Sequence, residues 1–231
     1  MKPSLLALLA LLGAALPGAA QESPLLDAAA PPEAPWVAPV PAAARWRIAV
    51  TPSAPPSDAP AENAPPVLKE IRVARTAPIK HDFLVYSDGT TEECWYLDKT
   101  IFQSETYSKK NIYASDFVPG SPDGLGDPVR ALGYTGFDWV GAKSYDGTVT
   151  FQGVSCYHYR KEAGGDAAEA WVRVPDKLPV AYRMHGVLYV YAFSPPPGEA
   201  LGLPASCEAV WNLALQQKKQ QALFSQDLGK H

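Results

Sequence analysis

Residues 81–102 read HDFLVYSDGTTEECWYLDKTIF, in which two apolar and aromatic runs flank the turn Ser87-Asp88-Gly89-Thr90. Asp-Gly between two such runs is a strong β-hairpin signal, because these residues tolerate the backbone angles that a two-residue turn requires. The stretch therefore predicts two strands, over 81–86 and 93–102, and with them a sheet protein.

Similar runs continue on both sides of this hairpin. They lie at 44–50, 68–75, 111–117, 148–151, 154–160, 170–174, 180–183 and 187–193. Turn residues at intervals of about ten residues are typical of an antiparallel sandwich or barrel. Run 44–50 alternates apolar and basic residues, so we expect a first strand that docks on the rest of the domain. The predicted fold class is mainly β.

The two ends of the chain have a different composition. Twelve of the 24 prolines lie between Pro24 and Pro66, and residues 21–44 are rich in Ala and Pro. Such a segment buries too little apolar surface to offset its ordering entropy, so we expect a disordered arm over 21–44. At the other end, 208–224 lacks Gly and Pro and predicts a helix, with Ser206 as its N-terminal cap. Residues 45–231 are then one domain.

The first 20 residues resemble a cleavable signal peptide. Lys2 precedes an apolar run over 5–12, and the small residues at 18–20 suit signal peptidase, so we expect cleavage before Gln21. The alternative is an uncleaved anchor, but Pro17 and Gly18 interrupt the apolar run too early for a membrane span. We therefore expect a secreted or periplasmic protein without a transmembrane span. The net charge of −4 argues against a nucleic-acid partner.

Three cysteines, Cys94, Cys156 and Cys207, follow the predicted signal peptide. An oxidising compartment would allow one disulfide among them, and the pairing is open; the alternative is three buried thiols. Cys156 and His158 could supply half of a zinc site, but structural zinc needs four ligands and the sequence holds no second pair at suitable spacing. We therefore expect no metal and no other cofactor.

Candidate catalytic groups are weak. Glu92 and Glu93 are neighbours and should point to opposite faces of a strand, whereas Asp98 is too far from Glu92 for paired carboxylates. The four histidines form no pair at helical or strand spacing; they are His81, His158, His185 and His231. Ser155 or Cys156 with His158 lacks a nucleophile elbow, and a lowered pKa at Cys207 would rest only on the helix start. We expect no enzyme.

Aromatic residues are concentrated on the predicted strands. Tyr157 and Tyr159 share one strand face, as do Tyr189 and Tyr191, so an aromatic wall is geometrically possible. The candidate ligand-binding residues are Tyr157, Tyr159, Tyr189, Tyr191, Trp139 and Trp171. They would form either a solid core or a concave apolar face that holds a ligand, and both interpretations stay open. For Trp95 we expect a mostly buried ring, with Trp95→Ala costing about 3–5 kcal/mol.

Several short motifs resemble the LolA-type lipoprotein carriers. They are LVYSDG at 84–89, CWYLD at 94–98, FQ at 102–103, LPV at 178–180, YVYAF at 189–193 and LGLP at 201–204. The resemblance implies a curved antiparallel sheet, an unclosed half-barrel, whose apolar concave face holds acyl chains under covering helices. The chain departs from this family at its start, where the arm replaces an amphipathic helix.

Together these features predict a non-catalytic exported binding domain. Its ligand would be lipid, acyl chains or another apolar molecule on the concave sheet face. The alternative is a structural or protein-interaction module of the cell envelope, in which the sheet is a solid core and the proline-rich arm meets a protein partner.

Overall fold

The computed structural model describes residues 31–52, 66–97, 100–104, 112–116, 133–162 and 167–228. The predicted signal peptide with its cleavage site before Gln21, the first part of the arm, Asp98 and His231 lie outside these residues.

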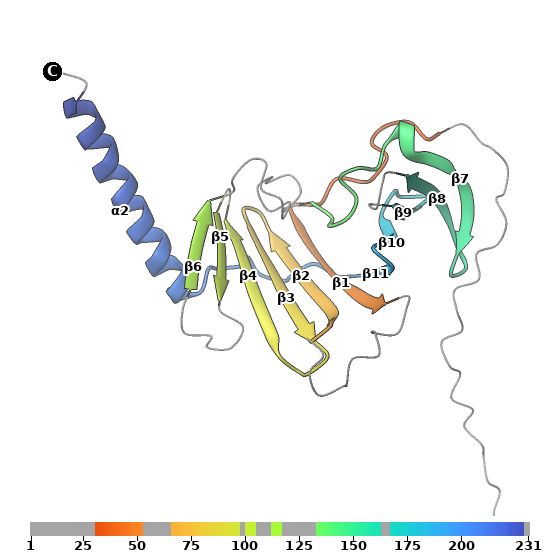
Figure 1. Ribbon diagram of the computed structural model, residues 1–231, viewed down its shortest axis with the longest axis horizontal. Helices are drawn as coiled ribbons and strands as arrows, with labels where there is room; N and C mark the ends of the chain where they lie inside the picture. The colour runs from red at the N-terminus through yellow and green to blue at the C-terminus, as the bar shows by residue number, and fades with distance from the viewer. Residues whose placement is uncertain are drawn as a thin grey trace, which may run out of the picture.

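Within the described ranges, eleven strands form one antiparallel sheet in the order β6-β5-β4-β3-β2-β1-β11-β10-β9-β8-β7. Their bounds are β1 Ala43–Pro52, β2 Leu68–Thr76, β3 Ile79–Tyr86, β4 Thr91–Leu97, β5 Thr100–Ser104, β6 Ile112–Asp116, β7 Tyr145–Phe151, β8 Val154–Lys161, β9 Ala168–Arg173, β10 Pro179–Met184 and β11 Val187–Ser194. Strands β6 and β7 lie at opposite edges, so the sheet is open. Figure 1 shows β1 to β6 as a fan, with β7 to β10 curling round beside it. The predicted unclosed, curved sheet is confirmed.

Strand β1 lies at the centre of this sheet. It pairs on one side with β2, where Ile48 faces Ile71, and on the other with β11, where Ile48 faces Tyr191. The first strand of the domain therefore joins two meanders, β1 to β6 and β7 to β11. We expected β1 to pack against the rest of the domain, whereas it is a central strand of the sheet.

The predicted strand 93–102 is wrong in one respect, because it contains two strands. Trp95 of β4 pairs with Phe102 of β5, and Leu97 pairs with Thr100, so the chain reverses within the run. Because Leu97 and Thr100 share a face, the alternation shifts by one residue between the two strands. In the sequence the polar pair Asp98-Lys99 stands at this shift.

Alternation along the strands creates two faces. We call the aromatic face the one that carries a buried cluster of ring-bearing and aliphatic side chains: Trp46, Ile48, Val73, Tyr159, Ala170, Val172, Tyr182 and Tyr191. We call the reverse face the opposite one, whose buried cluster lies on β7 to β10: Val149, Phe151, Cys156, Trp171 and Ala181. The strands β7 to β10 are thus covered on both faces.

The second half of the predicted disordered arm packs on the domain, which corrects that expectation. Trp36, Val37 and Val40 contact the cluster on the aromatic face. The Ala38 N–H donates to the Lys177 carbonyl at 2.8 Å. A tryptophan contributes a large apolar area, and this area together with a backbone bond holds a segment that proline content alone marks as unstructured.

Trp95 is partly buried, in keeping with the expected mostly buried ring, but it lies outside both buried clusters. On β4 the buried residues are Cys94 and Tyr96, which lie on the aromatic face. Trp95 points the other way and stacks on His81, with ring centroids 4.0 Å apart. Both faces of β4 carry an aromatic residue, so the residue pattern does not show which of them is the more buried.

The predicted C-terminal helix is present as α2, Ala205–Leu228, longer than expected. The Glu208 N–H donates to the Pro204 carbonyl, so the first turn begins before the predicted cap Ser206. Helix α2 contacts β6 and extends away from the sheet (Figure 1). Among the described helices, none combines the length and the apolar character needed to cross a membrane.

Candidate functional site

Five of the six aromatic residues predicted to bind a ligand lie on the aromatic face or against it. They are Tyr157, Tyr159, Tyr189, Tyr191 and Trp139. Two further tyrosines connect them: the Tyr182 ring stacks on Tyr189 at 4.2 Å, and the Tyr145 ring meets Tyr159 edge-on at 5.8 Å. Antiparallel pairing of β8 to β11 thus brings together side chains that are far apart in sequence.

Trp171 does not belong to this group. It is fully buried on the reverse face, where it stacks on Phe151 with ring centroids 4.5 Å apart and on His158 at 5.4 Å. Trp171 stands between Ala170 and Val172 in β9, so its side chain points to the face opposite theirs. Trp171 is a core residue, and it is removed from the candidate site.

The centre of the aromatic face is filled by a covering segment, residues 133–144. Its Tyr134 ring meets Trp46 edge-on at 5.2 Å, and its Phe137 ring meets Tyr191 at 5.6 Å. The Tyr191 hydroxyl donates to the Thr135 carbonyl at 2.7 Å. Gly136 has φ +83°, and a Cβ there would lie 2.7 Å from the Tyr182 ring. The chain can approach the sheet this closely because glycine stands at that position.

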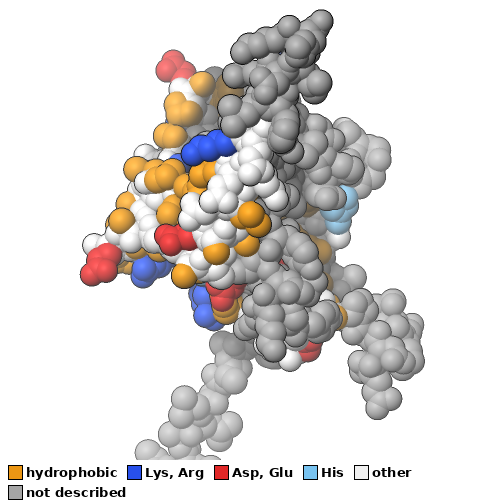
Figure 2. All heavy atoms as spheres, turned by 90° about the vertical axis from the view of Figure 1, so that its left-hand side faces the viewer, with side chains coloured by type: hydrophobic (Ala, Val, Ile, Leu, Met, Phe, Trp, Pro, Cys, Tyr) orange, Lys and Arg blue, Asp and Glu red, His pale blue; other side chains and the backbone are white. Residues whose placement is uncertain are grey.

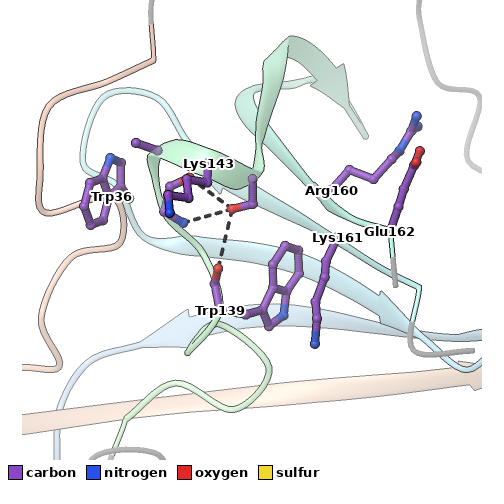
Figure 3. Close-up of a pocket in the computed structure, with 9 residues that line it drawn as sticks. Trp36, Trp139, Lys143, Arg160, Lys161 and Glu162 are labelled. Atoms are coloured by element: carbon purple, nitrogen blue, oxygen red, sulfur yellow. Dashed lines mark hydrogen bonds between the residues drawn. The ribbon is translucent and has the colours of Figure 1, made fainter. Parts of the chain in front are cut away.

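Beyond the covering segment the face opens into a cavity of about 670 Å³. Its lining combines two indole rings with several charged side chains: Trp36, Trp139, Gly141, Ala142, Lys143, Ser144, Arg160, Lys161 and Glu162. Figure 3 shows Trp36 on one side and Trp139 beside Lys161 on another. Three segments distant in sequence therefore build the cavity: the arm, the covering segment and the end of β8.

Ser144 shapes the wall of the cavity. Its hydroxyl accepts from the Gly141 N–H at 3.0 Å and lies 3.0 Å from the Gly141 carbonyl. These contacts close a short 3₁₀ turn, Ala142–Ser144, and the Trp36 ring packs over Gly141. A serine that bonds to the backbone three residues earlier thus fixes the orientation of the turn that carries Lys143.

Most of the cavity residues were not predicted from the sequence. Among the predicted ligand residues, only Trp139 lines the cavity. Trp36 is the one aromatic residue in 21–44, and an isolated tryptophan in an Ala/Pro segment was the available signal that this segment packs. The lysines gave no comparable signal, because exposed lysines are ordinary on any protein surface.

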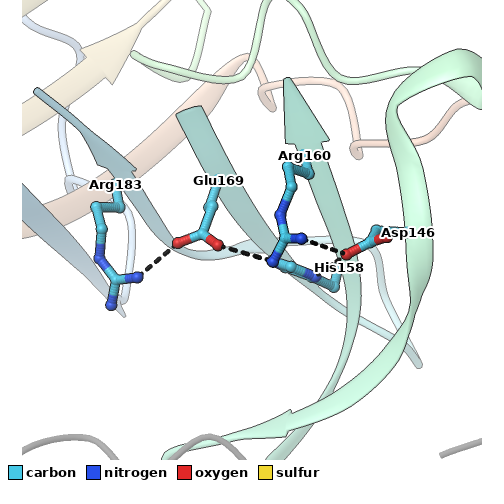
Figure 4. A network of polar contacts seen from close by, with 5 residues as sticks. All are labelled: Asp146, His158, Arg160, Glu169 and Arg183. Atoms are coloured by element: carbon cyan, nitrogen blue, oxygen red, sulfur yellow. Dashed lines mark hydrogen bonds and ion pairs between the residues drawn. The ribbon is translucent and has the colours of Figure 1, made fainter. Parts of the chain in front are cut away.

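A network of charged groups lies on the reverse face beside the cavity (Figure 4). Arg160 bridges Asp146 at 3.7 Å and Glu169 at 3.2 Å, and Arg183 also reaches Glu169, at 2.5 Å. The buried His158 ring contacts Asp146 at 3.1 Å. The network ties β7, β8, β9 and β10 together and holds Arg160 away from the aromatic face.

The candidate nucleophiles are not arranged for catalysis. Cys156 is fully buried, and burial raises the pKa of its thiol to about 11, so the reactive thiolate is scarce near neutral pH. Ser155 points to the face opposite His158. Burial also raises the pKa of Cys207, contrary to what a helix start alone would do.

The three cysteines are buried and none of them forms a disulfide in the described structure, so the disulfide considered from the sequence is absent there. Cys94 lies on β4 and Cys156 on β8, with six strands between them. The same described residues contain no cluster of three His, Cys, Asp or Glu side chains suited to a metal ion.

Glu92 and Glu93 lie on opposite faces of β4, as expected from the sequence. Glu92 accepts from the Tyr86 hydroxyl at 2.9 Å on the aromatic face, and Glu93 contacts His81 at 3.3 Å on the reverse face. In Figure 2, which faces the α2 side, hydrophobic and charged side chains are interspersed over the described surface, so this side presents no extended apolar patch. We take the Trp36–Trp139 cavity as the candidate site.

No family model and no curated protein matches the chain. Among solved structures, the Mycobacterium tuberculosis lipoprotein LppX is similar at a TM-score of 0.38 and 9% identity, over 69% of this chain and 88% of that one.

Proposed function

We propose that this chain is an exported, non-catalytic binding protein that holds an apolar ligand, such as a lipid or an acyl chain, at the edge of the aromatic face. The observation that carries the proposal is the cavity between Trp36 and Trp139. Its volume of about 670 Å³ lies in the range typical of small-molecule sites. Export is proposed from the signal-like residues 1–20.

The walls of the cavity suit an apolar ligand. Both indole rings pack against the aromatic cluster and remain partly exposed. Rings supported in this way lose little conformational freedom when a ligand binds, so their apolar area contributes efficiently to affinity. The Tyr145 and Tyr157 rings meet edge-on at 6.3 Å and pack against the same aromatic cluster.

One observation favours the alternative, a structural or protein-interaction module. Tyr134 and Phe137 are each only 6% exposed, and they fill the part of the aromatic face that a large ligand would need. On that interpretation the sheet is a solid core and the cavity at its edge is incidental. The two functions differ in whether an apolar molecule binds with defined stoichiometry.

The test is ligand recovery followed by titration. Protein purified without detergent should carry a lipid or acyl chain in native mass spectrometry, and stripped protein should bind dodecanol in calorimetry. Trp139→Ala should weaken dodecanol binding by about tenfold, which is the loss of about 1.4 kcal/mol of buried ring contact. Trp95→Ala is the matched control, because Trp95 lies on the reverse face of β4. No bound lipid and no saturable titration would reject the proposal in favour of the structural module.

A further inference from the structure

The charges around the cavity point to the kind of head group that its ligand carries. The chain as a whole has a net charge of −4, yet the cavity lining holds three cations and one carboxylate. This local excess of positive charge runs against the overall balance. It therefore reflects the arrangement of particular side chains at this site.

The three cations are not equivalent. Arg160 already bridges Asp146 and Glu169. Lys143 and Lys161, in contrast, make no ion pair or hydrogen bond with a described residue. The charge of Arg160 is largely offset by its two carboxylates, whereas no described carboxylate forms an ion pair with either ammonium group.

Strand geometry places Lys161 on the ligand side. Alternation along β8 puts Lys161 on the same face as Tyr159, while Arg160 and Glu162 point to the other face. Figure 3 shows this division: Lys161 extends beside Trp139, and Arg160 and Glu162 lie together on the far side. Glu162, the carboxylate in the cavity lining, therefore lies beside Arg160 and away from Trp139.

From this geometry we propose that the cavity binds an anionic amphiphile, a single acyl chain with a carboxylate or phosphate head. The acyl chain lies between Trp36 and Trp139, and Lys143 and Lys161 bind the head at the open rim. This inference rests on the proposed function and deepens it. An ammonium at the rim keeps most of its hydration while its aliphatic stem lies along an indole ring, so it binds an anion with a smaller desolvation penalty than a buried ammonium would.

The experiment compares ligands that share one chain and differ in the head. Dodecanoate, dodecyl phosphate, dodecanol and dodecyltrimethylammonium are titrated into the full chain by calorimetry. Both anions should bind more tightly than dodecanol, and the ammonium should bind most weakly. The advantage of the anions should shrink as salt is added, because exposed charges are screened.

Variants assign the effect to the two lysines. Lys143→Gln combined with Lys161→Gln should weaken both anions by about fivefold to tenfold, the sum of two exposed ion pairs, and leave dodecanol unchanged. Lys69→Gln is the matched control, because Lys69 is an exposed lysine on β2 outside the cavity.

The possible outcomes separate the two proposals. If dodecanol binds as tightly as the anions, or if the lysine variants change nothing, the head-group inference is overturned, and loss of dodecanol binding in Trp139→Ala still supports the proposed function. Tighter binding of the ammonium also overturns the inference. If none of the four ligands binds, both proposals fail. A difference between dodecanoate and dodecyl phosphate identifies which anion the site prefers.

Discussion

The strands in the two halves of the sheet share the same alternating pattern, but their side chains are buried to different extents. In β7 to β10, Tyr159 on the aromatic face and Trp171 on the reverse face are both fully buried. In β2 to β4, the aromatic face is covered, and it includes the charged pair Lys80 and Asp82; on the reverse face Trp95 is only half-buried. A strand covered on both faces contributes more apolar burial per residue. We therefore expect β7 to β10, which adjoin the cavity, to be the more stable half.

The largest expected effect is at Trp171. Trp171→Ala should lower the free energy of unfolding by about 3–5 kcal/mol, because it leaves a large cavity between Phe151 and His158. Urea denaturation of the two proteins measures the difference. Trp171→Phe is the control: the indole Nε1 has no hydrogen-bond partner, so the phenyl ring removes an unsatisfied donor and should cost clearly less. Equal losses for Ala and Phe would contradict the packing interpretation.

The charged pair in the other half comes second. The Lys80 ammonium contacts the Asp82 carboxylate at 2.8 Å, and their side chains are 2% and 11% exposed. Asp82→Ala should cost about 3 kcal/mol, because a buried ammonium loses its carboxylate partner. The double variant Lys80→Met, Asp82→Leu should recover most of that loss, because it removes both charges from the interior. If the double variant is as unstable as Asp82→Ala, the loss of stability does not come from an unpaired buried ammonium.

Trp95→Ala should lower the free energy of unfolding by a smaller amount, about 1–2 kcal/mol. The ring is only partly buried, and the main contact that the substitution removes is the stacking on His81. Thermal denaturation alongside Trp171→Ala compares the two halves directly. A loss at Trp95 as large as the loss at Trp171 would show that β4 is covered on both faces in solution.

The smallest expected effect is alkaline destabilisation of the tyrosine-rich half. Burial raises the pKa of Tyr134 from 10 to about 12. The unfolded chain therefore loses this proton first as the pH rises, so the stability from Tyr134 is complete below pH 10 and disappears as the pH passes about 12. Tyr134→Phe should flatten the dependence of the melting temperature on pH in this window. An unchanged slope would place the ionising group elsewhere.

Much of the fold follows from local patterns. The Asp88-Gly89 turn, the period-two runs and the helix at the end are local features, and each appears in the structure near its predicted place. Tyr157, Tyr159, Tyr189 and Tyr191 were also assigned correctly to shared strand faces. Strand alternation depends only on backbone geometry, so it can be predicted without knowing the neighbours.

The candidate site was predicted only in part. Trp139 was identified, but Trp36 was assigned to a disordered arm and Trp171 to the wrong face. The cavity also depends on Lys143 and Lys161, whose exposed side chains differ in no sequence feature from other surface lysines. They line the cavity because the arm and the covering segment meet at the end of β8.

The sequence by itself determined most of the strands, their two faces, the Asp88-Gly89 turn and the terminal helix, because these depend on interactions between near neighbours. Only the tertiary structure decided which face is covered and where β1 lies. Coverage of Trp46 comes from Tyr134, and the wall opposite Trp139 comes from Trp36. Contacts between such distant segments depend on how the whole chain packs, and a two-residue period gives each strand two faces without specifying which one a distant segment will cover.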